Sequence, residues 1–177
     1  TAQEDLLHTI YAGHGEFPRA VFAPGTIQQA FYLAQKAFNL ADKSQVPVFI
    51  LTDQFLMDSY YNMESMNIFN LKIEKHIVET DKNYKRYALT ENGISPRGIP
   101  GYGKGLVCLD SDEHDETGHI TESMQVRNSF VEKRLKKQNL LEQNMTEPEL
   151  IGPDDYKTLV LCWGSTYLPC REAVDVL

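Results

Sequence analysis

The fold class is decided by residues 20–51, AVFAPGTIQQAFYLAQKAFNLADKSQVPVFIL. A short apolar strand over 20–23 is broken by Pro24-Gly25, and Thr26 with Gln29 then matches the start of a capped helix. Apolar side chains recur at helical spacing as far as residue 41, and residues 46–51 are apolar throughout, as in a buried parallel strand. This order of elements predicts an α/β fold with a parallel sheet and flanking helices.

The segments on either side extend this unit to residues 1–61. Thr1 and Glu4 fit a capping box, and an apolar stripe from Leu6 to Tyr11 predicts a helix before the first strand. After the second strand, Asp53 is expected either to cap a helix over 54–60 or to lie at a ligand site, because open α/β sheets bind ligands at the carboxyl ends of their strands.

The α/β rhythm is lost over residues 62–120, which read as an irregular β and loop segment of the same domain. Short strands are predicted over 84–89 and 106–109, on either side of a stretch rich in Gly and Pro. A long connecting helix is predicted within residues 121–147, beginning at Thr121.

Residues 155–177 read as the beginning of a second α/β domain that is truncated. A strand over 158–163, a Gly164-Ser-Thr166 turn and a helix from Arg171 are predicted. A single strand-loop-helix unit buries too little apolar surface to close a core by itself.

Composition and charge narrow the class of partner. The formal net charge is -8, which argues against nucleic acid, because a phosphate-binding surface needs a basic excess. No apolar run approaches the roughly 20 residues that span a bilayer, and no secretion signal is visible at the start, so a cytoplasmic location is expected. The three cysteines form no C-x-x-C pair and assemble no metal cluster. Cys108 and Cys162 are expected in the core.

Two motifs invite a metal or nucleotide interpretation. Gly98 to Gly105 almost matches a phosphate-binding loop, but Gly105 stands where a hydroxyl must reach magnesium, so a tight structural loop is favoured. Residues 112–119 hold four carboxylates with His114 and His119, but their spacing matches no known metal motif, and an exposed or partner-facing loop is the preferred interpretation.

Three further features are candidate functional elements. His14 and Glu16 lie in a Gly-bounded turn before Arg19. They suit either a proton relay or a polar turn with no catalytic role. The Gly164-Ser-Thr166 turn could present amides to an anion. The long helix carries five basic residues, which suggest a docking face for an acidic partner or, more simply, a solvated face. They are Arg127, Lys133, Arg134, Lys136 and Lys137.

The order of several blocks along the whole chain resembles the alpha subunits of 2-oxoacid:ferredoxin oxidoreductases, most closely the 2-oxoglutarate type, also called 2-oxoglutarate synthase. The blocks are Gly13–Arg19, Ala23–Thr26, Thr52–Gln54, Asn92–Arg97, Ile99–Gly101, Asp110–Glu116, Gly118–Glu122, Val131–Arg134 and Trp163–Thr166.

The resemblance implies a partial thiamine-diphosphate pyrimidine-type domain, followed by the start of a transketolase-C-terminal-like domain. It implies oxidative decarboxylation of a 2-oxoacid with coenzyme A and transfer of electrons to ferredoxin. In such complexes thiamine diphosphate and magnesium are bound mainly by the beta subunit, and iron–sulfur clusters lie in other subunits. A branched-chain 2-oxoacid or pyruvate enzyme, or a non-catalytic assembly subunit, is the alternative.

The resemblance also ranks the candidate residues. His14, Glu16 and Asp53 lie in matching blocks and are expected near the active site, although no catalytic role can be assigned to them. His114 and Glu116 are expected at a subunit interface or at the edge of the active site. The upstream thiamine-facing motif and the basic residue for the substrate carboxylate are expected before Thr1. No metal ligand is assigned within this chain.

Overall fold

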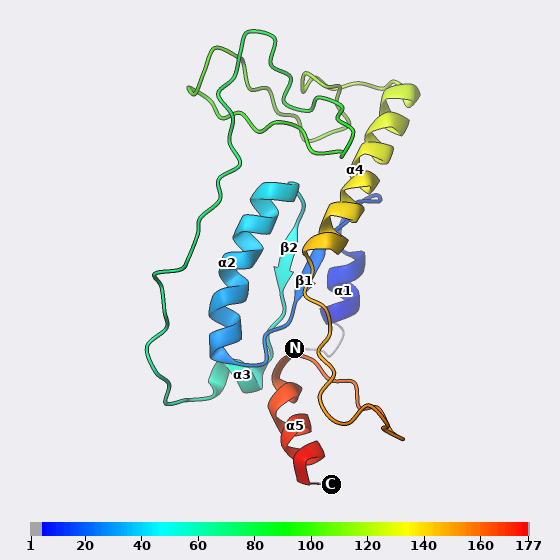
Figure 1. Cartoon of the computed structure of the whole chain (residues 1–177). Helices are drawn as coiled ribbons and strands as arrows, with labels where there is room; N and C mark the ends of the chain where they lie inside the picture. The colour runs from blue at the N-terminus through cyan, green and yellow to red at the C-terminus, as the bar shows by residue number, and fades with distance from the viewer. Residues whose placement is uncertain (1–4, 177) are drawn as a thin grey trace.

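The computed structural model describes residues 5–176 and contains the predicted α/β unit (Figure 1). The proposed capping box at Thr1 and Glu4 lies outside the described residues. In chain order the elements are α1 (Asp5–Tyr11), β1 (Ala20–Phe22), α2 (Ile27–Ser44), β2 (Val48–Ile50), α3 (Gln54–Asp58), α4 (Met124–Asn144), the 3₁₀ turn η1 (Gly164–Thr166) and α5 (Tyr167–Val176).

Strands β1 and β2 form a parallel two-stranded sheet, as the sequence predicts. Ala20 faces Val48 and Phe22 faces Ile50 in the register, and the ladder continues from the Leu51 amide to the Phe22 carbonyl at 2.8 Å. Helix α2 makes the crossover between them. Thr26 caps it by accepting a hydrogen bond from the Gln29 amide at 3.1 Å, which confirms the predicted helix start.

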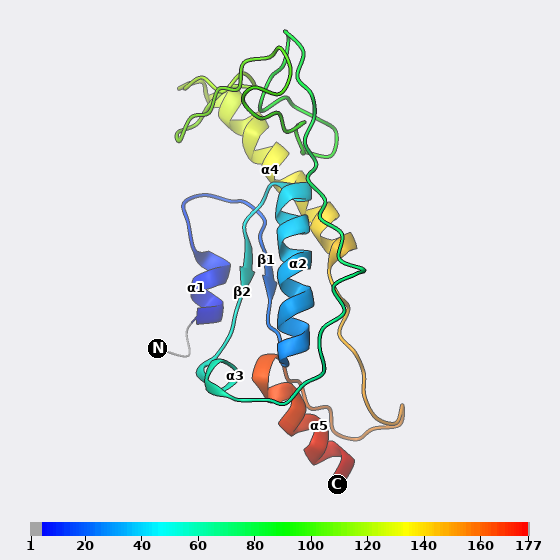
Figure 2. The ribbon, with the colours of Figure 1, turned by 90° about the vertical axis from the view of Figure 1, so that its left-hand side faces the viewer.

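The main core lies between the sheet, α2 and the last turns of α4. Its buried side chains are Ala20, Phe22, Ala37, Leu40, Val46 and Leu141. Helix α1 lies on the other side of the strands from α2 (Figure 2). The expectation that 46–51 is a buried strand is wrong in part, because Val46 is buried but Ile50 keeps 37% of its surface. Among the described residues β2 has β1 as its one strand neighbour, so its other edge stays open.

Residues 62–120 form an irregular excursion, as predicted, but the expected strands over 84–89 and 106–109 are wrong. Within the described chain this region contains isolated bridges instead of ladders, for example between Thr80 and Gly103. The 98–105 loop wraps around Thr80 so closely that a Cβ at Gly103 would lie 2.3 Å from the Thr80 backbone. This packing confirms that the segment resembling a phosphate-binding loop is a tight structural loop.

Helix α4 begins three residues later than predicted, because Thr121 is used in the preceding loop. The Thr121 amide donates to the Glu113 carbonyl, and the Ser123 side chain caps the helix at the Val126 amide. The excursion folds over the first turns of α4 (Figure 1). The predicted solvated basic face is therefore wrong in part, since Lys133 keeps only 6% of its surface.

The C-terminal segment also departs from expectation. Residues 158–163 are largely exposed and form no strand, because no partner strand lies beside them in the part of the chain that is described. Cys162 is exposed rather than in the core, and Cys108 is half-buried with its thiol 3.2 Å from the Gly118 carbonyl. Helix α5 begins at Tyr167, four residues before the predicted start.

No helix within residues 5–176 combines the length and apolar character needed to cross a membrane.

Candidate functional site

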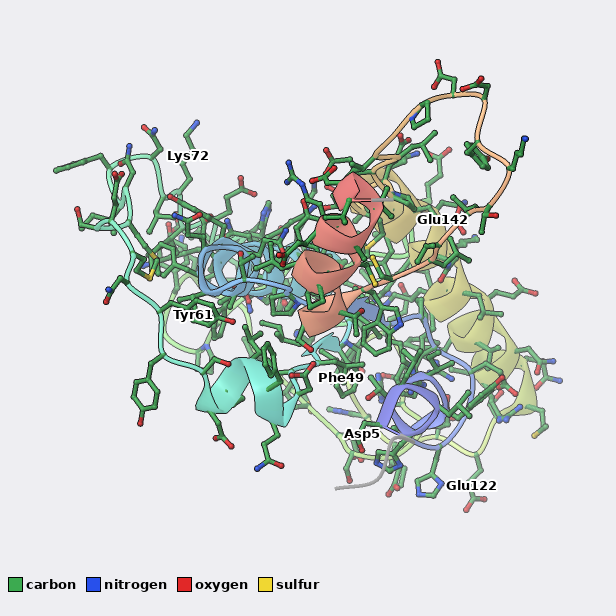
Figure 3. All side chains as sticks on the ribbon, turned by 90° about the horizontal axis from the view of Figure 1, so that it is seen from below. Asp5, Phe49, Tyr61, Lys72, Glu122 and Glu142 are labelled. Atoms are coloured by element: carbon green, nitrogen blue, oxygen red, sulfur yellow. The ribbon has the colours of Figure 1, made fainter. Side chains whose placement is uncertain are left out.

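Three loops from distant parts of the chain meet at the carboxyl end of the sheet. They are the segment after β1 around Gly25, the segment after β2 around Asp53, and η1 with the first turn of α5. Figure 3 looks onto this end, with α3 and α5 nearest to the viewer. Ligands of parallel α/β sheets bind at this end of the strands, so this junction is the candidate site.

The carboxylate of Asp53 ties two of these loops together. It caps α3 by accepting a hydrogen bond from the Leu56 amide at 2.9 Å, and it accepts another from the Ser165 hydroxyl. The Ser165 hydroxyl, and after it the Leu56 amide, lower the pKa of Asp53 below its ordinary value. Asp53 is therefore ionised at neutral pH and serves as a fixed anion rather than as a proton acceptor.

The close approach of two glycines completes the junction. A Cβ at Gly25 would lie 2.5 Å from the Gly164 carbonyl oxygen and 2.9 Å from the Tyr167 Cβ. Gly164 itself has φ 61°, a left-handed conformation that glycine adopts without strain. These contacts place η1 against the strand ends, where Ser165 meets Asp53. The sequence suggested that this turn could offer its amides to an outside anion. In the structure the chain's own Asp53 carboxylate takes that place, because a hydrogen bond from the Ser165 amide also lowers the pKa of Asp53.

His14 and Glu16 do not join this junction. They lie in the exposed turn before β1, at the amino end of the sheet, whereas Asp53 follows β2 at the carboxyl end. No hydrogen bond links the two side chains in the described structure, so the proton-relay interpretation has no geometric support. Arg19 instead anchors this turn by donating to the Thr9 carbonyl at 2.9 Å and to the Ala12 carbonyl.

His114 and Glu116 lie in the excursion, half-buried against α4 and the segment around Tyr87. The His114 ring packs 3.8 Å from the Tyr87 ring centroid and 5.4 Å from that of Phe130. Glu116 accepts hydrogen bonds from the Leu89 amide at 2.9 Å and Lys85 at 3.2 Å. The Leu89 amide is the main cause of its lowered pKa. Both residues hold the excursion together, and their role at an interface or active-site edge stays a prediction.

The acidic loop around these residues is organised by its own hydrogen bonds. Asp115 accepts from the Thr117 hydroxyl and from the amides of residues 117–119, and these bonds, the Thr117 hydroxyl foremost, lower its pKa to about 2. Among the described residues, no three side chains of His, Cys, Asp or Glu gather in a way that could hold a metal ion. The loop therefore reads as a self-capped turn.

Sequence reasoning found Asp53 and the Gly164–Thr166 turn separately but missed that they touch. Their contact spans 112 positions, and no local pattern encodes it. A signal was available in the small residues at both loops, since Gly25 and Gly164 permit a close backbone approach. Chemically, the junction can hold two chain segments in a fixed relation at the edge where a ligand of this fold class binds.

Comparisons with known proteins identify the relatives of this chain. The family described as pyruvate flavodoxin/ferredoxin oxidoreductase, thiamine diP-bdg, matches residues 1–133. The alpha subunit of 2-oxoacid:ferredoxin oxidoreductase 1 from Sulfurisphaera tokodaii is 41% identical over 99% of this chain. A 2-oxoglutarate synthase subunit KorA from Methanocaldococcus jannaschii is 25% identical over 98% of this chain.

A solved structure extends the likeness to three dimensions. The 2-oxoglutarate:ferredoxin oxidoreductase from Magnetococcus marinus, solved with 2-oxoglutarate, coenzyme A and succinyl-CoA bound, superimposes with a TM-score of 0.78 at 29% identity. The match covers 99% of this chain and 31% of that chain. The chain likewise spans 29% of the Sulfurisphaera subunit and 46% of the Methanocaldococcus subunit.

Proposed function

This chain belongs to the family of 2-oxoacid:ferredoxin oxidoreductase alpha subunits, and from that membership we propose that it works in a thiamine-dependent complex that oxidises 2-oxoglutarate. In the proposed reaction the bond between C1 and C2 of the 2-oxoacid breaks and releases carbon dioxide. A thioester forms between C2 and the sulfur of coenzyme A, giving succinyl-CoA. The two electrons pass to ferredoxin, and the thiol proton goes to solvent. The expected setting is the cytoplasm.

The observation that carries the proposal is the superposition over 99% of this chain on an enzyme whose structure holds 2-oxoglutarate, coenzyme A and succinyl-CoA. The Methanocaldococcus relative, a 2-oxoglutarate synthase subunit, supports the same substrate. The Sulfurisphaera relative has a higher identity and a name that specifies only a 2-oxoacid, which favours a second candidate, an enzyme that also accepts pyruvate or branched-chain 2-oxoacids.

The polar side chains of the described chain suit a surface beside thiamine diphosphate better than a binding site for its diphosphate group. Magnesium and a diphosphate need several oxygen ligands, and within residues 5–176 no three acidic, His or Cys side chains are placed so that they could hold a metal ion. Asp53 is already engaged by Leu56 and Ser165. We therefore assign the diphosphate and its metal to the beta subunit and the iron–sulfur clusters to other subunits.

The residues at the carboxyl end of the sheet suit contact with an organic ring or with a partner subunit. Ile50 and Phe55 keep 37% and 61% of their surface, and both lie at or just after the end of β2. When bound, thiamine diphosphate supplies the carbanion chemistry. In the proposal this chain contributes an apolar wall, held in position by the Asp53–Ser165 contact.

The proposal is tested by co-expressing the full-length alpha subunit with its beta subunit. Reduction of a dye is then measured with coenzyme A and 2-oxoglutarate, pyruvate or a branched-chain 2-oxoacid. Turnover that prefers 2-oxoglutarate and requires thiamine diphosphate supports the first candidate, and similar rates with several 2-oxoacids support the second. If a folded complex reduces the dye with none of them, the chain is an assembly subunit and the enzymatic proposal fails.

A variant connects this assay to the structure. Asp53→Ala removes the Asp53–Ser165 contact, whereas Asp58→Ala removes a carboxylate from the other end of the same short helix. We expect Asp53→Ala to lower turnover more than Asp58→Ala while both subunits remain associated. Equal turnover in the two variants would contradict a role for the junction in shaping the site.

A further inference from the structure

Four cationic side chains converge where the excursion meets α4 and the end of α2. We call Arg86, Lys133, Arg134 and Lys137 the cationic cluster. Lys137 donates to the Gln45 carbonyl at 2.8 Å, and Arg86 donates to the Gln45 side-chain oxygen at 2.9 Å. Lys133 donates to the carbonyl of the neighbouring Tyr87 at 2.6 Å. Gln45 and Tyr87 thus hold three of the cations with neutral acceptors.

The cationic cluster has few compensating negative charges. Glu113 lies 2.8 Å from Arg134. The carboxylate of Glu116 also acts on Lys133, but it is engaged by Lys85 and the Leu89 amide. No other carboxylate lies within ion-pairing distance of the four cations in the described part of the chain. The site therefore combines four positive charges with one directly paired negative charge.

The lowered pKa values of Lys133 and Lys137 reflect this shortage of negative charge. Burial and then neighbouring cations lower the pKa of Lys133 and of Lys137 to about 8 each. For Lys133 the largest cationic contribution comes from Lys137, and for Lys137 it comes from Arg86. A bound anion would relieve this repulsion, because an opposite charge favours the protonated form of a lysine.

A pocket opens beside the cluster at the amino end of the sheet. It has a volume of about 220 Å³, and Arg134, Lys137 and Gln45 supply its polar lining. Its remaining walls are apolar and come from residues 17–18 and 46–47. Apolar walls exclude water and strengthen the attraction between an anion and a cation. A guanidinium next to an ammonium is a combination that suits phosphate oxygens.

We propose that this pocket binds the phosphate group of a small phosphorylated organic molecule, with Arg134 and Lys137 as the contacting cations. A phosphate dianion offsets more of the charge excess than a single carboxylate does. A second groove, of about 440 Å³, adjoins the pocket and shares Phe17 and Pro18 with it. Its lining mixes Ile10, Tyr11 and Leu135 with Glu16 and Arg19, so it offers space for the organic part.

The binding test uses the full-length protein in its complex and inorganic phosphate as the probe. Titration calorimetry is performed at constant ionic strength on the wild type, Lys137→Met and Lys136→Met. Lys136 is the matched control, because it is the exposed neighbour of Lys137 on the same helix. Other phosphate-binding sites of the complex are common to the three proteins, so the difference between the variants reports on this pocket.

We expect Lys137→Met to weaken phosphate binding about tenfold, the change that follows from losing one charge-assisted hydrogen bond, and Lys136→Met to leave it unchanged. Equal affinities in the two variants, or no binding by the wild type, would overturn the proposal. Phenyl phosphate should bind more tightly than inorganic phosphate if the adjoining groove takes the organic part. If it binds no more tightly, the site takes free phosphate only and the organic part of the proposal fails.

A second test uses the wild-type protein and therefore does not depend on the correct folding of a variant. Acylation of lysines at about pH 8, where roughly half of a side chain with a pKa near 8 is uncharged, is followed by mass spectrometry with and without phosphate. Phosphate should slow the labelling of Lys137 and leave that of Lys136 unchanged. Equal effects on both lysines, or on neither, would count against the pocket.

Discussion

The burial of Lys133 leads to a pH-dependent prediction. This side chain keeps 6% of its surface, and its ammonium donates to the Tyr87 carbonyl at 2.6 Å. Burial lowers its pKa from the ordinary 10.5 to about 8. The folded protein therefore releases this proton at a lower pH than the unfolded chain does. It follows that the free energy of unfolding rises with pH between about 8 and 10.5 and loses this contribution below pH 8.

The magnitude follows from the width of that window. Each pH unit between the two pKa values is worth about 1.4 kcal/mol, so about 2 kcal/mol separates about pH 7 from about pH 9.5. Lys133→Met removes the titrating group and the hydrogen bond to Tyr87. At pH 7 the loss of the hydrogen bond is offset by the loss of a buried charge. At pH 9.5 the wild-type amine is largely neutral, and the lost hydrogen bond has no such offset.

We therefore expect Lys133→Met to lower the thermal midpoint of the full-length protein more at pH 9.5 than at pH 7. Differential scanning fluorimetry in phosphate-free buffer measures this difference, with Lys136→Met as the exposed control. The control should shift the midpoint equally at both pH values. If Lys133→Met also gave the same shift at both, Lys133 would have an ordinary pKa and the account of the cationic cluster would be wrong.

Three further predictions address other contacts. Gly25→Ala places a Cβ 2.5 Å from the Gly164 carbonyl oxygen, so it should lower the free energy of unfolding by about 1–3 kcal/mol and speed proteolysis around residue 164. Unchanged cleavage would contradict the close packing of Gly25 against Gly164. Asp53→Ala removes the cap on the Leu56 amide and should lower the free energy of unfolding by about 1 kcal/mol, measured by thermal unfolding. This loss should shrink in acid, because the wild-type carboxylate becomes protonated, and a pH-independent loss would argue against a charged cap. Phe130→Ala removes a side chain that is 3% exposed, so it should lower the free energy of unfolding by about 3–5 kcal/mol and speed amide hydrogen exchange over 84–89. Unaltered exchange there would show that the excursion does not depend on its packing against α4.

The central α/β unit was predictable because its signals are local. Thr26 and Gln29 mark the start of α2 within four residues, and the apolar runs on either side match β1 and β2. The cap at Asp53 was also predictable, as one of two stated alternatives. Each of these features depends on neighbours in sequence, so pattern and propensity suffice to find them.

The failures share the opposite property. The segments 84–89, 106–109 and 158–163 looked like strands, yet none has a strand partner within the described residues. The basic residues of α4 looked solvated because charge at helical spacing usually is. Lys137 reaches a carbonyl 92 positions away and Lys133 one 46 positions away. Contacts over such separations leave no trace in a local window.

The two ends of the sheet differ in how they meet the need for a negative charge. At the carboxyl end, amides and a hydroxyl converge, and the carboxylate of Asp53 accepts their hydrogen bonds. At the amino end, four cations converge with Glu113 as their one direct partner among the described residues. Both arrangements attract anions, but only the first is satisfied by the chain itself. An external phosphate is therefore expected at the amino end, because there the described chain leaves an excess of positive charge.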